Sequence, residues 1–275
     1  MTSETPAPPA PDSRTPDTRA KENRREEIAA YVLRQGEARI DDLVQHFGVS
    51  RMTIHRHIDQ LAASGLLRKQ HGGVTALPSG VYESLFRYRQ TVATAEKSSL
   101  ARAALRFVEP GQVVMLDDSS TSHAVAGLLP QLAPLTVITN SLASLQALTG
   151  MDEISLICLG GQFHPTYNAF IGHLCETALP ALRANVLICS ASAAQNGVAY
   201  IQDAQVTRTK QAMMASANRR ILLLNHEKFG RSALHALAPL STFDAVLTAS
   251  TLPHAEIQAL KAAGVRLHLI ETDPK

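Results

Sequence analysis

The sequence predicts an α/β protein of 275 residues, in which a small, mainly helical domain precedes a larger domain built on a mainly parallel sheet. Apolar residues recur at helical spacing up to about residue 67, which indicates short amphipathic helices. From Lys97 onward, short apolar runs alternate with helix-length segments, the pattern of a parallel sheet covered on both faces. Pro78-Ser79-Gly80 lies between these two sequence patterns and is expected to mark the domain boundary. We therefore expect a disordered tail over residues 1–22, a first domain over 23–78, a linker over 79–96 and a second domain over 97–275.

Composition narrows the class of protein. The formal net charge is only +2, so any affinity for nucleic acid must come from a local basic patch. Tryptophan is absent and aromatic residues are scarce, which argues against a protein that binds single strands by stacking their bases. The N-terminal tail is rich in proline and threonine and has no apolar run of the kind found in signal peptides or membrane spans. We therefore expect a cytoplasmic protein.

Two short helices are expected at the start of the first domain. The first covers residues 24–35 and ends at Gly36. The second has Asp41 as its expected N-cap and Gly48 as the turn that follows it. The residues expected to face inward are Ile28, Ala29 and Val32 in the first helix and Leu43, Val44 and Phe47 in the second.

A third helix follows the glycine turn. Ser50 is its expected N-cap, and Gly65 is expected to end it. Ile54, Ile58 and Leu61 form one apolar stripe at i, i+4 and i+7. The opposite face is expected to carry Arg51, Met52, Thr53, His55, Arg56 and His57. Helix, glycine turn and helix with a basic outer face is the helix-turn-helix pattern, although a small helical domain with solvated charges gives the same periodicity.

The residues after this helix favour the helix-turn-helix interpretation. Residues 66–74 read as two short strands around a basic turn, which is typical of a wing that lies along a DNA backbone. Between Ser50 and Gly73 the arginines and lysines outnumber the single acidic residue, Asp59, by three. The residues predicted to contact double-stranded DNA are Arg51, Met52, Thr53, His55, Arg56, Arg68, Lys69 and His71.

This region resembles the N-terminal domain of the DeoR/GlpR family of bacterial transcription regulators. The resemblance rests on the segment DDLVQHFGVSRMTIHRHIDQLAASGLLRKQHGGV, particularly its VS, its TI, Arg56 and the final HGG. Two positions depart from the family, since His55 stands where an arginine is usual and His57 where an aspartate is usual. A lone domain of this kind makes few base contacts, so we expect a homodimer or a higher oligomer on repeated half-sites.

In the second domain, seven apolar runs predict strands and five intervening segments predict helices. The strands are expected at residues 113–116, 135–138, 154–159, 186–189, 221–224, 245–247 and 265–270. The helices are expected at residues 99–108, 123–129, 142–148, 205–217 and 253–263.

Polar residues follow several of these strands, at the sheet edge where open α/β sheets bind ligands. Residues 117–122 (DDSSTS), 139–141 (TNS), 160–161 (GG) and 225–230 (NHEKFG) occupy such positions. Hydroxyls and free N–H groups at a helix start favour a phosphate, and Lys228 and Lys210 could add positive charge. Ordinary helix capping explains one such loop equally well, but several at one edge favour a pocket for a phosphorylated sugar or polyol.

The resemblance to the family continues through about Leu247. It rests on EKSSLARAALRFVEPGQVVMLDDSSTS, VITNS, GG, TRTKQAMMASA and NHEKFG, and Arg89 and Lys97 occupy places where the family has an arginine and a lysine. The resemblance implies an effector domain that senses phosphorylated sugars, with a fold similar to ribose-5-phosphate isomerases and acyl-CoA transferases. The effector contacts expected here are Asp117, Ser119, Ser120, Thr121, Thr139, Asn140, Gly161, Lys210 and Lys228.

Four positions depart from this second part of the family pattern. Ser119 replaces a glycine, and Asn185, Asn225 and Ala249 each replace an aspartate. The lost carboxylates indicate an altered ligand or none, and they also argue against catalysis, because isomerisation of a sugar needs a carboxylate base.

We interpret the chain as a transcription regulator, a repressor of carbohydrate-metabolism genes that a phosphorylated sugar releases from its operator. No cofactor, no catalytic residue and no metal site is expected, because adjacent residues such as His226 and Glu227 do not have metal-ligand spacing. One alternative is an isomerase-like enzyme carrying a DNA-binding domain, with Asp117, Asp118 and Glu227 as its acids and bases. Another is an architectural DNA-binding protein whose second domain only assembles oligomers.

Overall fold

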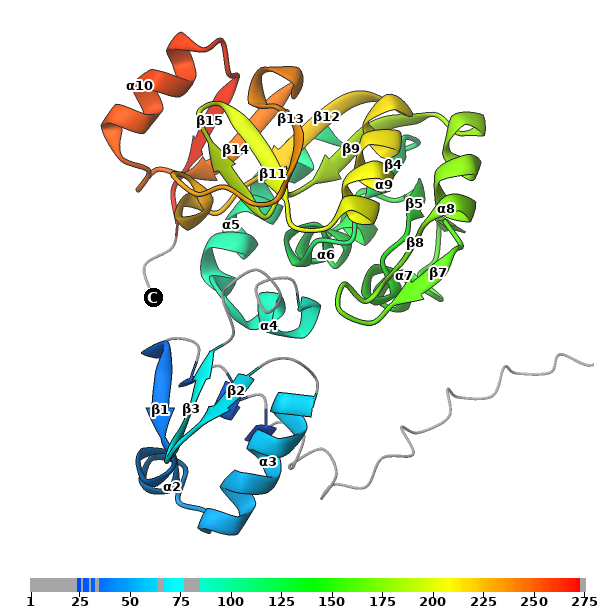
Figure 1. Cartoon of the computed structure of the whole chain (residues 1–275). Coiled ribbons are helices and arrows are strands. Elements are labelled where there is room, and N and C mark those ends of the chain that lie inside the picture. Colours follow the sequence, from blue (N-terminus) through cyan, green and yellow to red (C-terminus); the bar gives the residue numbers. More distant parts are fainter. Residues whose placement is uncertain are drawn as a thin grey trace, which may run out of the picture. The chain divides into compact units, whose positions relative to one another are not determined.

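A computed structural model describes residues 24, 25, 27–29, 31, 32, 35–63, 67–76 and 85–272 (Figure 1). The chain divides into two compact units, Met1–Ser79 and Gly80–Lys275. The tail expected over residues 1–22 and the helix end expected at Gly65 lie outside the described residues. No helix within the described ranges is long and apolar enough to cross a membrane.

Among its described residues, the N-terminal unit has three helical segments and a small antiparallel sheet. The described residues between 24 and 32 are helical, and Ile28, Ala29 and Val32 are buried, as the spacing predicts. The elements that follow are β1 (Glu37–Arg39), α2 (Ile40–Phe47), α3 (Arg51–Ala63), β2 (Leu67–Gln70) and β3 (Gly73–Ala76). The sheet order is β1-β3-β2, so the predicted wing is confirmed, and β1 is a third strand that the sequence reading did not anticipate.

Helix α3 follows the predicted pattern with one correction. Ile54, Ile58 and Leu61 are buried, and the Ser50 hydroxyl accepts a hydrogen bond from the Thr53 amide at 3.2 Å. His57, expected on the outer face, is only 3% exposed. It lies three residues after Ile54 and four before Leu61, and this spacing places it on the buried side of the helix. Burial lowers its pKa, and the nearby Arg56 lowers it further.

The N-cap expected at Asp41 is wrong, because α2 begins two residues earlier than that cap requires, with Arg39 at the cap position. Asp41 instead lies in the first turn, where an acidic side chain complements the helix dipole. Its carboxylate is 3.2 Å from the Arg51 guanidinium of the next helix.

Glycine is required at positions 72 and 73 of the wing for two different structural reasons. Gly72 has φ of +73°, a left-handed conformation that suits the turn between β2 and β3. Gly73 has no such φ, but a Cβ there would lie 2.7 Å from the Ala38 carbonyl oxygen of β1. The HGG motif therefore lets the wing turn and also lets β3 lie against β1.

The C-terminal unit is built on a seven-stranded parallel sheet of order β15-β14-β12-β9-β4-β5-β6. Each of the seven predicted strands is present, which confirms the mainly parallel α/β class. Their bounds are β4 (Val113–Leu116), β5 (Leu135–Thr139), β6 (Ile154–Cys158), β9 (Ala184–Cys189), β12 (Ala217–Leu223), β14 (Ala245–Ala249) and β15 (Leu267–Ile270).

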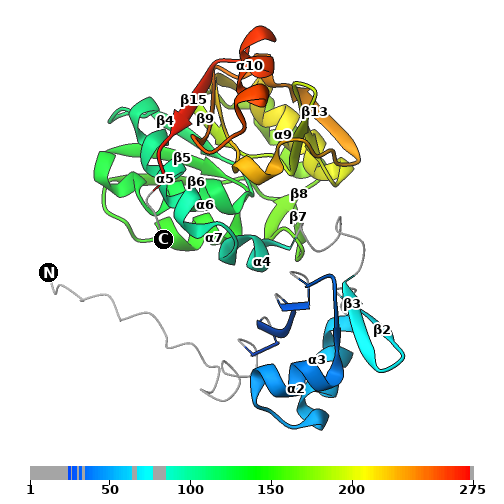
Figure 2. The same ribbon diagram turned by 90° about the vertical axis from the view of Figure 1, so that its left-hand side faces the viewer.

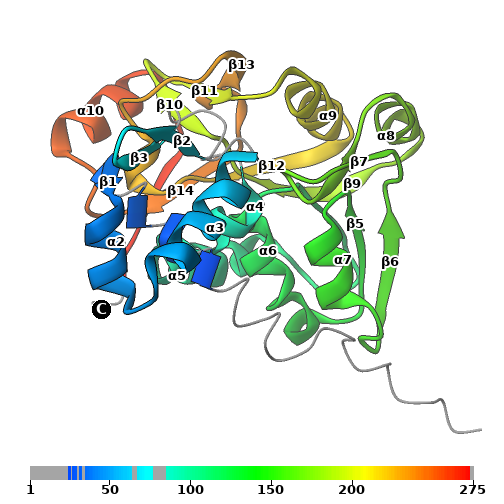
Figure 3. The same cartoon turned by 60° about the horizontal axis from the view of Figure 1, so that its bottom comes forward.

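Helices cover both faces of this sheet (Figures 2 and 3). On one face α5 (Thr94–Ala104), α6 (Ser120–Ala126) and α7 (Leu142–Leu148) pack on side chains such as Val114 and Leu116. On the other face α8 (His173–Ala178), α9 (Ala204–Ala215) and α10 (His254–Ala262) pack on side chains such as Met115. Successive residues of a strand point to opposite faces, so each predicted apolar run supplies both cores.

Several elements differ from the prediction. Helix α6 begins at Ser120, three residues earlier than expected, so most of the predicted hydroxyl loop forms the first helical turn. Helix α5 begins at Thr94, and the segment before it contains α4 (Phe86–Thr91). The unpredicted strands form a hairpin, β7 (Gln162–His164) with β8 (Ala169–Ile171), and a small sheet of β10 (Ala193–Gln195), β11 (Val198–Ile201) and β13 (His235–Pro239).

Candidate functional site

Four neighbouring strands of the large sheet end at one edge, and the residues that follow them form the candidate site. Asp117 and Asp118 follow β4, Asn140 follows β5, and Ser190 follows β9. Asn225 comes two residues after β12. All four strands are parallel and adjacent in the sheet, so these residues gather at its carboxyl edge, where such sheets bind ligands.

A buried ion-pair network occupies the centre of this edge. The Asp117 carboxylate is fully buried and accepts hydrogen bonds from the Ser119 amide at 3.0 Å and the Ser190 amide at 2.9 Å. The Lys210 ammonium, from α9, donates to the same carboxylate and lies 2.8 Å from the Asp118 carboxylate. Burial alone opposes both charges, but the pairing holds the pKa of Asp117 below its usual value and that of Lys210 above it.

Two further lysines lie close to this network. Lys228 donates hydrogen bonds to the Ser190 hydroxyl at 3.1 Å and the Ala191 carbonyl at 2.7 Å. Desolvation, followed by repulsion from Lys97, Arg89 and Lys210, lowers the pKa of Lys228 to about 7. The buried Lys97 ammonium donates to the Arg89 carbonyl, and desolvation together with the Arg89 charge lowers its pKa to about 8.

Positive charge exceeds negative charge at this edge. We call Arg89, Lys97, Lys210 and Lys228 the cation cluster. Facing these four side chains are Asp117, Asp118 and Glu96, and Glu96 also accepts from the His226 amide at 2.7 Å and contacts the His226 imidazole at 2.9 Å. Desolvation is the main cause of the lowered pKa values of Lys97 and Lys228, and repulsion between the cations lowers them further; a bound anion would offset both.

Some of the hydroxyl groups at this edge make hydrogen bonds within the chain and stabilise the fold. The Ser119 hydroxyl caps α6 by accepting from the Ser122 amide at 3.0 Å, and the Ser141 hydroxyl caps α7 by accepting from the Ser144 amide at 3.3 Å. The Thr139 hydroxyl accepts from the Ser141 amide at 3.1 Å. Ser119 has φ of −76°, so this loop does not require the glycine that the family carries. Helix capping therefore accounts for Ser119, and a hydrogen bond within the turn after β5 accounts for Thr139, without a ligand.

Three polar atoms at the same edge have no hydrogen-bond partner among the described residues. They are Thr121 Oγ1, Asn140 Oδ1 and Asn225 Oδ1, and all three side chains are buried. Asn140 does donate through its amide nitrogen to the Phe170 carbonyl at 3.0 Å, which fixes its orientation. A buried polar atom without a partner destabilises the folded chain, and three of them beside the cation cluster make this edge the candidate site for a polar ligand.

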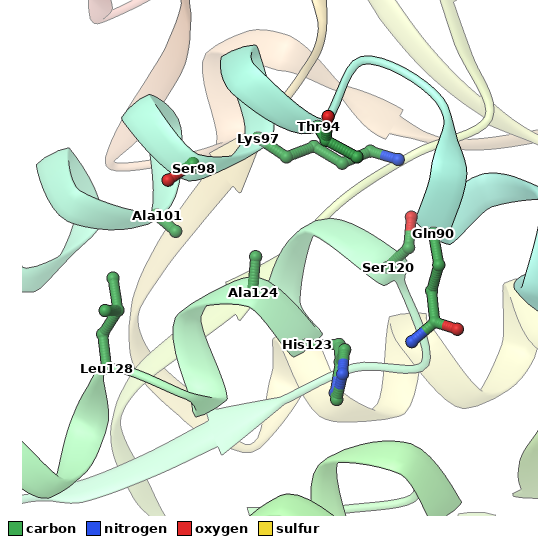
Figure 4. Close-up of a pocket in the computed structure, with 9 residues that line it drawn as sticks. All are labelled: Gln90, Thr94, Lys97, Ser98, Ala101, Ser120, His123, Ala124 and Leu128. Carbon is green, nitrogen blue, oxygen red and sulfur yellow. The ribbon is translucent and has the colours of Figure 1, made fainter.

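A cavity of about 230 Å³ adjoins the cation cluster at Lys97 (Figure 4). It lies between α4, α5 and α6, and Lys97 and Ser120 belong to its wall. One part of the wall is polar and the other is made of small or aliphatic side chains. Its lining residues are Gln90, Thr94, Lys97, Ser98, Ala101, Ser120, His123, Ala124 and Leu128.

Several residues singled out in the sequence lie outside this site. Asn185 is near the amino end of β9, at the opposite edge of the sheet, where its side chain accepts from the Val113 amide at 2.8 Å. Its departure from the family therefore does not remove a ligand contact. Ala249 is the buried last residue of β14, and Glu227 is exposed. At Gly161 a Cβ would lie 2.6 Å from the Ile171 carbonyl oxygen, so close packing on β8 explains the glycine.

Sequence reasoning did not include Arg89, Lys97, Asp118 or Ser190 among the expected effector contacts. Arg89 and Lys97 come from helices, and the rule that points to residues after strands does not reach them. Their match to the family pattern was the available signal. Ser190 contributes its amide and hydroxyl because β9 lies between β4 and β12, an order the sequence does not reveal.

The N-terminal unit presents a separate exposed basic surface. On α3, Arg51, His55 and Arg56 are exposed, Met52 is 82% exposed, and Thr53 is half-buried beside Ser50. On the wing, Arg68, Lys69 and His71 are exposed. Lys69 forms an ion pair with Asp59 of α3, and Arg51 forms the one with Asp41 described above.

Comparison with known proteins matches both units to described families. The DeoR-like helix-turn-helix domain matches residues 24–79, and the DeoR C terminal sensor domain matches residues 92–250. The L-fucose operon activator of Haemophilus influenzae is 34% identical over 231 residues, which cover 84% of this chain and 92% of that protein. The glycerol-3-phosphate regulon repressor of Escherichia coli is 29% identical over 243 residues, covering 88% and 96%.

Solved structures give a weaker likeness. A D-ribose-5-phosphate isomerase in complex with phospho-erythronic acid superposes with a TM-score of 0.37 and 16% identity, over 48% of this chain and 52% of that one. A likeness at this level carries no argument about what this chain binds.

Proposed function

The chain belongs to the DeoR family of transcription regulators, and on that premise we propose that it represses carbohydrate-metabolism genes until a phosphorylated sugar or polyol releases it from its operator. Relatives are named for a glycerol-3-phosphate regulon, a lactose phosphotransferase system and an L-fucose operon. Two of these are named repressors and one is named an activator, so repression by this chain, rather than activation, is part of the proposal.

The proposed DNA contacts are the exposed residues of α3 and the wing. Arg56 and His55 would read base edges in the major groove, with Arg51, Met52 and Thr53 alongside them. Arg68, Lys69 and His71 would contact the backbone. Two such domains on repeated half-sites supply enough contacts for specificity, so we propose that the chain acts in the cytoplasm as a homodimer or a higher oligomer.

The observation that carries the effector proposal is the cation cluster beside three unpartnered buried polar atoms. A phosphate dianion would supply the missing negative charge and accept hydrogen bonds from Lys228, Lys97 and Thr121. The adjoining cavity, which Ser120 lines, has room for a small hydroxyl-bearing group. Asn140 and Asn225 offer carbonyl oxygens to the hydroxyls of a sugar or polyol.

Binding without turnover is the proposal for this site. The alternative, an isomerase, needs a carboxylate whose pKa lies near the working pH and that can reach the substrate. Asp117 accepts from two amides and one ammonium, and its pKa is held low, so it is a poor proton acceptor. Asp118 is buried and lies 2.8 Å from the Lys210 ammonium, and Glu227, the third candidate, is exposed.

The test is operator release by a panel of triose, pentose and hexose phosphates, measured by fluorescence anisotropy on an operator selected from random duplexes. We expect one class of sugar phosphate to weaken operator binding by the wild-type chain. Lys228→Met should bind operator normally and resist release, because it removes a phosphate contact and leaves the DNA-binding unit unchanged. Lys261→Ala, which changes an exposed lysine on α10, is the matched control and should respond as the wild type does.

Each alternative gives a different result. Consumption of the sugar phosphate without an added co-substrate would favour an isomerase. Operator binding that no member of the panel alters would favour an architectural protein. Arg56→Ala serves as the negative control for DNA recognition, since it should lose preference for the operator and keep its fold by circular dichroism.

A further inference from the structure

Helix α4 is the first described element of the C-terminal unit in chain order, and one of its side chains reaches the candidate site. The Arg89 guanidinium lies 3.8 Å from the Asp118 carboxylate, and it also lies 5.7 Å from the ring centres of Phe86 and Tyr167. The Arg89 carbonyl accepts the hydrogen bond of Lys97. Both the side chain and the backbone of one α4 residue are therefore attached to charged groups of the site.

From these contacts we propose that α4 transmits effector occupancy from the site to the chain segment that leads to the N-terminal unit. The proposal rests on the function proposed above, and it concerns how that same site is regulated. In the structure Arg89 pairs with Asp118, and Lys97 donates to the backbone carbonyl of Arg89 in α4. A bound phosphate takes over both partners, and α4 changes its position.

The competition favours the phosphate. An arginine–phosphate pair is bidentate and charge-assisted, whereas the contact between Arg89 and Asp118 is long at 3.8 Å. Asp118 keeps its other partner, Lys210, when Arg89 leaves. Lys97 exchanges a neutral carbonyl acceptor for an anion, which offsets the desolvation and the Arg89 charge that lower its pKa. Both changes release α4 from the contacts that Arg89 makes with Asp118 and Lys97.

The remaining contacts of α4 provide a pivot. The Phe86 amide donates to the Thr166 carbonyl at 2.8 Å, and the Phe86 ring is buried edge-on against His123. At the other end, Ala93 joins α4 to α5 with φ of +51°, a left-handed conformation that is unfavourable for alanine. The amino end of α4 is therefore fixed by packing, while its carboxyl end is held by the contacts that phosphate replaces.

The test compares full-length wild type with Arg89→Gln and, as a matched control, Arg87→Gln, which changes an exposed arginine of the same helix. Glycerol 3-phosphate, ribose 5-phosphate and fructose 6-phosphate are titrated by calorimetry. Operator affinity is then measured by anisotropy without sugar phosphate and at saturation for each variant. Hydrogen exchange of residues 86–91 is followed under the same conditions.

We expect Arg89→Gln to bind operator more weakly than wild type without sugar phosphate, because loss of the Asp118 contact already releases part of α4. At saturation, its operator affinity should fall by less than one third of the wild-type fold-change, and exchange at residues 86–91 should no longer respond. Arg87→Gln should retain both responses. If Arg89→Gln does not fold, Arg89→Lys replaces it. Lysine keeps the positive charge but cannot bind phosphate through two parallel N–H groups, so this variant should lose part of the response to sugar phosphate.

A full wild-type response in saturated Arg89→Gln would overturn the role of α4 and leave the proposed function intact. A wild-type protein whose operator binding none of the three probes alters would overturn both proposals. A lower affinity for the probe with an unchanged response at saturation would also overturn the inference, because it would make Arg89 only a binding residue.

Discussion

Thr121 lies in the first turn of α6 with its hydroxyl buried and without a partner, while Ser119 provides the cap of that helix. Replacement by valine keeps the shape and removes the unpaired group. We expect Thr121→Val to leave the melting temperature of the free protein unchanged or slightly higher, because no hydrogen bond is lost. Effector binding should weaken by about 1.5–3 kcal/mol, or about 10- to 160-fold, the contribution of one hydrogen bond to a charged group.

A matched control for this prediction lies in β14. Thr248 is also buried with an unpartnered hydroxyl, but it belongs to a strand rather than to a loop at the site. Thr248→Val should have the same effect on melting temperature and none on effector affinity by calorimetry. A lower melting temperature in Thr121→Val with unaltered effector affinity would mean that the hydroxyl serves the fold.

Lys228 links effector binding to pH. Its pKa of about 7, lowered by desolvation and neighbouring cations, should rise when a phosphate binds, and that of Lys97, about 8, should rise with it. The complex then holds more protons than the free components, so affinity should fall as pH rises from 7 to 9. At pH 8 the ligand phosphate is already a dianion, because its second pKa is about 6, and the proton uptake comes from the protein.

Calorimetry at pH 8 in two buffers of different ionisation enthalpy measures this uptake directly. We expect about one proton taken up per effector bound by wild type, on the scale set by two lysines with pKa values near the working pH. Lys228→Met should lose most of that uptake. Proton release, or no exchange in wild type, would remove both lysines from the phosphate contacts.

The sequence identified the polar residues that follow strands, and it could not identify their partners. Asp117, Thr121 and Asn140 were expected at the site because the ends of parallel strands share an edge. Whether a given hydroxyl caps a helix or stays unpaired depends on where the helix starts, and α6 starts three residues before the predicted position. Arg89 reaches the site only through the packing of α4 on α6, which no local pattern encodes.

At the scale of elements, the wing is held to α3 by the ion pair of Lys69 with Asp59, both largely exposed. Replacing Arg68 and Lys69 by alanine together should weaken binding to all duplexes equally. The slope of log affinity against log salt should decrease by about 2, since each lost phosphate contact contributes about 0.9. Anisotropy on operator and random duplexes over a salt series provides the measurement.

The ion pair between Lys69 and Asp59 allows a second variant to be tested in the same experiment. Asp59→Asn frees Lys69 without altering the basic residues, so affinity for every duplex should increase. Arg56→Ala is the contrasting variant, because it should reduce affinity for the operator more than for random duplexes. If the wing variant lost affinity for the operator alone, the wing would read bases instead of contacting the backbone.

Burial explains which elements the sequence predicted well. Strands such as β4 and β9 have both faces covered, so they appear as continuous apolar runs bounded by polar residues. The missed strands β7, β8 and β10 have three residues each and pair within small sheets, which leaves too little pattern to recognise. His57 was misassigned because an apolar stripe defines the centre of a buried face and not its width.

At the scale of the whole molecule, the proposed function requires that the effector and the operator compete through the conformation of one chain. If the effector weakens operator binding by some factor, thermodynamic linkage requires the operator to weaken effector binding by the same factor. We therefore expect a lower calorimetric affinity for the sugar phosphate when the protein is saturated with operator than when it is free. The ratio of the two affinities should equal the fold-change measured by anisotropy in the reverse direction.

Controls for this last prediction come from both units. A random duplex at the same concentration should lower effector affinity much less than the operator, since the competition involves the specific complex. Arg89→Gln should reduce the effect in both directions equally, because linkage makes the coupling the same in both directions for every variant. Two directions that disagree in wild type would mean that the sugar phosphate displaces DNA by a route other than a shared conformational equilibrium, such as direct occupation of the basic surface of α3 and the wing.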